Sequence, residues 1–284
     1  HHELLPRLMT AYAAAPPPVR SALLRASEAL AAALGHSNPQ LVALVASPPP
    51  GAEALVTHMV EVLMESLLPS ETMLAACRAR YAACRDAGVL APVVGALSKG
   101  EVAGLLPSLL QVPGLDPKAL YRKLARGTPG AGLDPLFSPP ELLVALHALD
   151  PGRDAIPPKT LMAAVDAALH TPDVFPQQAV AQAVQQMEAA VPLPLLFMRT
   201  VITALKALPR LKPFITDLLG RLVTKQVWMD RNQWRGFVML VENNGAAFFP
   251  VLLQLPAPVL ERLLAPALTQ QAQGAPPPKP TAEP

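Results

Sequence analysis

Two histidines of this chain stand beside carboxylates at spacings that could support chemistry. His58, Glu61 and Glu65 are three and four residues apart, so an imidazole and two carboxylates would share one helical face and could bind a metal ion. His147 lies three residues before Asp150. We interpret the first group as the solvated face of an amphipathic helix, and we expect His147 to make a local hydrogen bond near a helix end. We therefore predict no metal ligands and no bound cofactor.

The remaining nucleophiles show no catalytic spacing. The sequence contains no GxSxG elbow, no phosphate-binding glycine loop and no GxGxxG turn after a strand. Cys77 and Cys84 lack CxxC spacing, and on a helix they would lie ~10 Å apart along its axis, too far for a disulfide. This pattern favours a reducing compartment and a protein that is not an enzyme, with no catalytic residues.

The elements that would position these side chains are helices. Apolar residues make up 51% of the chain but aromatic residues only 4%, and an apolar fraction rich in Ala and Leu suits closely packed helices. Many of the 35 prolines precede a run of helical periodicity, where a first turn tolerates them. We expect helices at residues 3–15, 19–34, 52–67, 71–87, 101–111, 117–125, 141–149, 159–169, 177–190, 195–207, 213–224, 231–243, 248–254 and 259–268.

The spacing of these helices suggests a repeat architecture. A helical pair recurs about every 35–40 residues, near the period of HEAT and armadillo repeats. The predicted fold class is therefore all-α, an irregular HEAT- or armadillo-like α-solenoid, with a compact irregular helical domain as the alternative. We expect helical hairpins at 1–93, a second helical domain at 94–269 and a disordered proline-rich tail at 270–284. Residues 127–138 are expected to form a flexible loop, and residues 47–51 a stiff bend.

Positive charge is concentrated in one region. Residues 193–241 hold eight lysines and arginines against two aspartates, a net charge of +6, while the whole chain carries +2, so the remainder is about −4. In the first helix of this region, Arg199, Thr203 and Lys206 share one narrow polar face, and the other faces are apolar. Such a region suggests an acidic partner, either a protein or a nucleic acid.

Both tryptophans lie in the basic region, six residues apart. We expect Trp234 to pack with Phe237 in the core and Trp228 to be the more exposed of the two. No apolar run reaches the ~18 residues that a membrane span needs, and the first residues do not have a signal-peptide pattern. We therefore predict no membrane contact.

Several strings in the second half of the chain resemble the symplekin C-terminal family. They are KGEVAGLLPSLLQV (99–112), FSPPELLVALHALD (137–150), LLFMRTVITALKALPRLKPFITDLLGRLVTKQVW (195–228) and FFPVLLQLP (248–256). The similarity runs from about Val94 to Leu264, and the succession MRTVI, PRL and KQVW is its most specific part. Arg235 stands where the family leads us to expect an acidic residue.

The resemblance implies a nuclear scaffold of the pre-mRNA 3′-end processing machinery with a helical, HEAT-like fold. The implied partners are the nuclease subunit of the cleavage and polyadenylation specificity factor, a zinc-dependent endonuclease of the metallo-β-lactamase type, and its inactive paralogue. Zinc and hydrolysis would belong to the partner. The residues expected to bind a partner are Arg199, Lys206, Arg210, Lys225, Gln226 and Trp228.

Two other functions stay open at this point. The basic 193–241 region could bind RNA directly, and its affinity would then fall steeply as salt concentration rises. Fold analogy also allows a helical-repeat adaptor in membrane traffic or in junction plaques.

Overall fold

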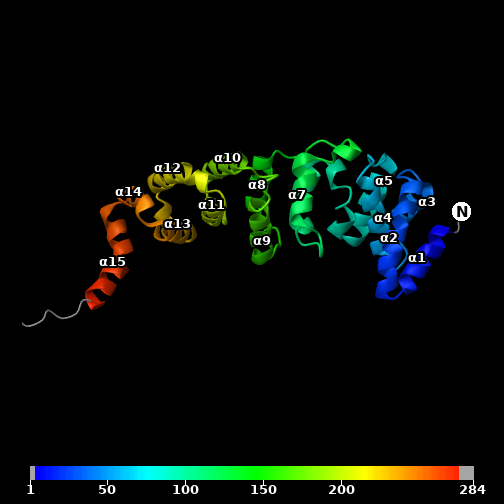
Figure 1. The fold of residues 1–284 in the computed structure, drawn as a ribbon, viewed down its shortest axis with the longest axis horizontal. Coiled ribbons are helices and arrows are strands. Elements are labelled where there is room, and N and C mark those ends of the chain that lie inside the picture. The colour runs from blue at the N-terminus through cyan, green and yellow to red at the C-terminus, as the bar shows by residue number, and fades with distance from the viewer. Residues whose placement is uncertain (1–3, 275–284) are drawn as a thin grey trace, which may run out of the picture. The chain divides into compact units, whose positions relative to one another are not determined.

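The computed structural model describes residues 4–274, and throughout these residues the regular secondary structure is helical (Figure 1). One isolated bridge between Thr128 and Leu133 is the sole β-type pairing in this range. The predicted all-α fold class is therefore confirmed. None of the described helices is long and apolar enough to cross a bilayer.

The chain packs as two compact units that divide after Pro194. The N-terminal unit (residues 4–194) contains α1 Leu4–Ala14, α2 Pro17–Leu34, α3 Pro39–Ala46, α4 Glu53–Met64, α5 Glu71–Cys84, η1 Ala87–Val89, η2 Val94–Ala96, α6 Lys99–Leu109, α7 Pro117–Arg126, η3 Pro129–Ala131, α8 Pro139–His147, α9 Pro158–Leu169 and α10 Gln177–Glu188. The C-terminal unit (residues 195–274) contains α11 Phe197–Ala207, η4 Pro209–Leu211, α12 Lys212–Thr224, η5 Val227–Met229, α13 Arg231–Asn244, η6 Gly245–Phe248, α14 Phe249–Leu252 and α15 Ala257–Gly274.

This division differs from the domain limits expected from the sequence. Residue 93 falls inside the N-terminal unit, where the short helix η1 contacts both α5 and α6 and so joins the segments on either side. Residues 270–274 of the expected tail continue α15, since Gln and Ala are good helix formers. The rest of that tail, 275–284, lies outside the described residues.

Side-chain caps and prolines start most of the helices, as the proline pattern predicts. In α6, Ser98 N–H donates to Glu101 at 2.9 Å and Glu101 N–H donates to the Ser98 hydroxyl at 3.3 Å, which forms a capping box. The helix α3 is absent from the sequence-based prediction. The side chain of Asn38 accepts hydrogen bonds from the first-turn amides of α3, and Pro39 occupies its first position, so this eight-residue helix carried a recognisable start signal.

In the N-terminal unit, contacts between alternate helices build the layers. α2 packs on α4, α3 on α5, α7 on α9 and α8 on α10, and Figure 1 shows the α2–α4 and α3–α5 neighbours. Helices of one layer stack in this way in helical-repeat proteins, because each repeat buries its apolar face against the next. Tyr121 of α7 links two such helices, since its hydroxyl donates to the Ala164 carbonyl of α9 at 2.8 Å.

The segment 127–138 is an ordered turn and not the flexible loop expected from its glycines. Thr128 N–H donates to the Leu133 carbonyl at 3.0 Å, and the reverse bond measures 3.2 Å. Ala131 and Phe137 are buried. Gly127 has φ = 72°, and a Cβ there would lie 2.0 Å from the Leu133 oxygen, so the glycine permits a tight closure.

The C-terminal unit is held together by the contact between α11 and α13. Phe197, Phe237 and Phe248 are fully buried in its core. A Cβ added at Gly236 of α13 would lie 2.5 Å from the Met198 Cβ of α11, so the two helices approach as closely as a glycine allows. This contact fixes which face of α13 points inward.

We expect Gly236→Ala to lower the free energy of unfolding of the C-terminal unit by about 1–2 kcal/mol, because the added methyl group must push α11 and α13 apart. Urea unfolding followed by tryptophan fluorescence measures this loss, since both tryptophans belong to that unit. Gly104→Ala is the control: the site is an exposed helical position of the N-terminal unit with open space around its Cβ. Alanine there should stabilise that unit by about 0.5–1 kcal/mol, measured by circular dichroism, and leave the tryptophan transition unchanged. Equal stability of wild type and Gly236→Ala would contradict the close contact.

A second prediction concerns His147, which is buried at the end of α8. Its Nδ1 lies 2.7 Å from the Leu143 carbonyl, so the expected local hydrogen bond is confirmed. Burial disfavours the imidazolium and lowers the pKa of His147 to about 4. The unfolded chain, with a histidine pKa of about 6.5, therefore takes up the proton first. This contribution to stability is complete above about pH 6.5 and is lost as pH falls toward 4.

From pH 7.5 to pH 5 we expect the N-terminal unit to lose about 2 kcal/mol through His147. Urea unfolding followed by circular dichroism should show this loss in wild type and much less of it in His147→Leu. Tryptophan fluorescence, which reports on the C-terminal unit, should respond to pH equally in both proteins. A similar pH dependence of the dichroism transition in the two proteins would argue against a buried neutral His147.

Candidate protein-binding surface

The residues expected to bind a partner lie on α11, on η4 and around the turn from α12 to η5, all in the C-terminal unit. Arg199 and Lys206 are exposed on α11, two turns apart, as their spacing predicts. Arg210 is exposed in η4, which connects α11 to α12. Lys225 and Gln226 are exposed where α12 ends. The structure therefore supplies a run of exposed basic side chains, with two of them aligned on one helix.

The turn between α12 and α13 determines where Trp228 points. Gln226 adopts the left-handed conformation with φ = 58°, which reverses the chain direction after α12. Val227 then anchors η5 by burial, and Trp228 is half-buried beside it. Asp230 closes the turn as the N-cap of α13, because its carboxylate accepts bonds from the amides of residues 232 and 233 at 2.9 and 3.1 Å.

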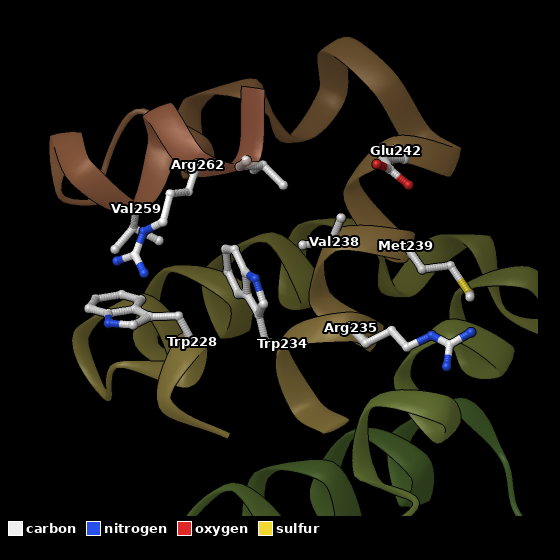
Figure 2. Close-up of a pocket in the computed structure, with 9 residues that line it drawn as sticks. Trp228, Trp234, Arg235, Val238, Met239, Glu242, Val259 and Arg262 are labelled. Atoms are coloured by element: carbon white, nitrogen blue, oxygen red, sulfur yellow. The ribbon is translucent and has the colours of Figure 1, made fainter. Parts of the chain in front are cut away.

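A groove lies between α13, α15 and this turn (Figure 2), and we call it the α13–α15 groove. Its volume is about 570 Å³. Figure 2 shows the two indoles at one end and Met239 and Glu242 at the other, with Arg262 of α15 on the side of Trp228. The lining residues are Trp228, Trp234, Arg235, Val238, Met239, Glu242, Val259, Arg262 and Leu263.

Trp234 is both a core residue and a surface residue. Its indole stacks on the Phe237 ring with 5.2 Å between centroids and 17° between planes, and Phe237 has no exposed surface. The predicted packing of Trp234 against Phe237 is therefore confirmed. Both indoles are half-buried and both line the α13–α15 groove, so the expectation that Trp228 is the more exposed of the two stays a prediction.

Trp228 is the one residue of the six expected at the partner site that lines this groove. Lys206 instead borders a separate cavity of about 170 Å³ between α11 and α13, beside Leu205 and Leu240. Sequence reasoning placed Arg235 in the basic region that holds both tryptophans but missed Met239 and Arg262 as groove residues. Arg235 and Met239 are one helical turn apart on α13, so periodicity could have grouped them, but no local pattern pairs α13 with α15.

The lining of the groove combines apolar side chains with charged ones. Met239, at the far end of the lining, exposes 43% of its surface to solvent. The charged residues of the lining are two arginines, Arg235 and Arg262, and one carboxylate, Glu242. The site can bind an apolar side chain and pair with an anionic group, and its lining contains one carboxylate, Glu242, but no Ser, Thr, Cys, His or Lys side chain.

His58 of α4 lies near one carboxylate of α2 and one of its own helix, at distances longer than a hydrogen bond. His58 Nε2 lies 3.6 Å from Glu28, and its Nδ1 lies 3.8 Å from Glu61. Within residues 4–274, no three His, Cys, Asp or Glu side chains are placed to hold one metal ion. Cys77 is buried and Cys84 exposed, and neither forms a disulfide.

Comparison with known proteins gives one family match. The family model described as the symplekin tight junction protein C terminal matches residues 86–267 of the chain. This range includes the whole of α6 to α14 and the first part of α15, and with them all nine groove-lining residues. No solved structure matches the chain.

We expect Asp230→Ala to lower the free energy of unfolding of the C-terminal unit by about 1 kcal/mol, because the first amides of α13 lose their acceptor. The emission of Trp228 should also shift, since the turn that carries it loses its closing contact. Tryptophan fluorescence during urea unfolding measures both effects. Asp217→Ala, at an exposed position inside α12 that caps no helix, should change stability by less than about 0.5 kcal/mol. Equal losses in the two variants would argue against the cap.

Proposed function

Because this chain belongs to the symplekin C-terminal family, we propose that it is a non-catalytic scaffold in pre-mRNA 3′-end cleavage and polyadenylation. Its partners are the nuclease subunit of the cleavage and polyadenylation specificity factor, of the metallo-β-lactamase type, and the inactive paralogue of that nuclease. The chain acts in the nucleus. Zinc binding and RNA hydrolysis belong to the nuclease, and this chain supplies the surface that holds it.

The observation that carries the proposal is the family match over residues 86–267, about two thirds of the chain. The surface chemistry agrees with it. Trp and Arg dominate the residues that contribute most binding energy at protein interfaces, and the C-terminal unit presents two half-buried indoles beside exposed arginines. Half-buried aromatic side chains offer a rigid apolar surface at a small entropic cost.

Direct RNA binding is the second candidate, and one observation favours it. Residues 193–241 carry a net charge of +6, and both indoles lie in this region. Proteins that bind single-stranded nucleic acids combine positive charge for the phosphates with aromatic side chains on which the bases stack. An adaptor role at junctions is the third candidate, to which the description of the matching family points. Identifying the molecule that the chain binds distinguishes these three functions.

The test is capture of the nuclease C-terminal domain by the purified chain. We expect wild type to bind it and the combination of Arg199→Ala, Lys225→Ala and Trp228→Ala to weaken binding at least ~10-fold, because hot-spot side chains each contribute more than about 1 kcal/mol. Arg25→Ala with Lys159→Ala, two exposed basic positions in the N-terminal unit, is the matched control and should bind like wild type. Circular dichroism confirms that each variant is folded.

Unchanged capture by the triple variant would put the interface elsewhere, and failure of wild type to capture the domain would contradict the proposed partner. Titration with single-stranded RNA at two salt concentrations tests the second candidate. Tight binding that falls ~10-fold or more between them would identify an RNA-binding module.

A further inference from the structure

The α13–α15 groove has the properties of a docking site whose occupant is acidic. Neither Arg235 nor Arg262 has an ion-pair partner among the described residues, and the sole hydrogen bond of the Arg262 side chain goes to its own helix, at the Pro258 carbonyl 3.1 Å away. Elsewhere in the described chain, arginines such as Arg78 and Arg122 are paired with carboxylates at 2.9 Å. The groove thus contains two guanidinium groups that lack a carboxylate partner.

The apolar part of the groove is partly preformed. Trp234 is fixed by its stacking on the buried Phe237, so little side-chain entropy remains to be lost when a ligand packs on it. Val238, Val259 and Leu263 supply aliphatic surface beside the indoles. Met239, exposed at the far end, can adapt its shape to a ligand. A volume of about 570 Å³ is typical of pockets that bury a few side chains, which fits a short segment.

We propose that the α13–α15 groove docks a short acidic segment of a partner protein. An aromatic or aliphatic side chain of that segment packs against Trp228 and Trp234, and flanking carboxylates pair with Arg235 and Arg262. The charge of the groove is the reason to expect an acidic occupant. The groove lining holds two arginines and one glutamate, and residues 193–241 carry a net charge of +6. A basic segment would therefore be repelled as it approaches the groove.

The chain's own residues 275–284 are a poorer match for this chemistry. They have the sequence APPPKPTAEP, in which Lys279 cancels Glu283, and they contain no large apolar side chain that could pack between two indoles. The proposed partner segment has both a net negative charge and a large apolar side chain.

This inference deepens the proposed function, because it names the place and the chemistry by which a partner would be held. It can nevertheless be tested without that partner. The probe is a synthetic peptide in which Leu and Phe at helical spacing are flanked by glutamates, and its control is the same peptide with every glutamate replaced by lysine.

Both tryptophans of the chain line the groove, so fluorine-labelled tryptophan reports on it without background. With 5-fluorotryptophan incorporated, the full chain should give two fluorine resonances, and the acidic peptide should shift both while the basic peptide shifts neither. Arg235→Glu with Arg262→Glu should weaken the response to the acidic peptide at least ~10-fold and leave the unfolding midpoint within the range of a surface substitution. Arg25→Glu with Lys159→Glu, which reverses the same number of charges in the N-terminal unit, should leave the response unchanged.

Equal responses to the acidic and the basic peptide, or no response to either, would overturn the proposal. A shift of both resonances on deletion of residues 275–284, with no peptide present, would also overturn it, since the tail would then be the occupant. Capture of the nuclease domain by wild type and equally by Arg235→Glu with Arg262→Glu would leave the proposed function intact and remove the groove from it. If wild type does not capture the nuclease domain but still responds to the acidic peptide, the proposed partner is contradicted and the groove remains a docking site for acidic segments.

Discussion

The close contact between α11 and α13 governs the C-terminal unit. Gly236 lets the two helices meet at Met198, because a Cβ added at Gly236 would lie only 2.5 Å from the Met198 Cβ. Phe237, the next residue of α13, is fully buried. With one face of α13 committed to the core, its opposite face must carry Trp234, Arg235, Val238 and Met239 outward. The groove then follows once α15 lies along that outer face, buried at Val259 and increasingly exposed toward Leu264. The groove therefore exists because the contact between α11 and α13 fixes the orientation of α13.

The titratable groups of the N-terminal unit stabilise helix ends and helix pairs. The Arg78 guanidinium and the hydrogen bonds of Ser98 lower the pKa of Glu101 to about 2, and the Ser138 amide with Lys99 does the same for Glu141. Both carboxylates thus belong to capping boxes. Burial keeps His147 neutral and bonded to its own helix. These side chains therefore stabilise the stacked helices through local hydrogen bonds and ion pairs.

Local signals accounted for most of the helices but not for how they are divided into units. The apolar periodicity and first-turn prolines located fourteen expected helices, each of which overlaps an observed one, because a helix is stabilised by residues three and four apart. α3 was missed since it has only eight residues, although Asn38 and Pro39 marked its start. Segment 127–138 was misjudged because its order comes from the pairing of Thr128 with Leu133 and from burial of Phe137, contacts that its glycines conceal.

The sequence by itself determined the all-α fold, the excess of positive charge in residues 193–241 and the family, since composition, periodicity and motif order are all properties of the linear chain. It also pointed to Trp228. Only the tertiary structure decided which residues stand around that indole. Arg262 is more than thirty residues from Trp228 along the chain, and Arg235 was noted only as one of the basic residues near the two tryptophans and as a departure from the family pattern. Their convergence depends on the packing of α13 and α15. The periodicity of a helix shows which of its faces is apolar, but it does not show which distant helix packs on that face.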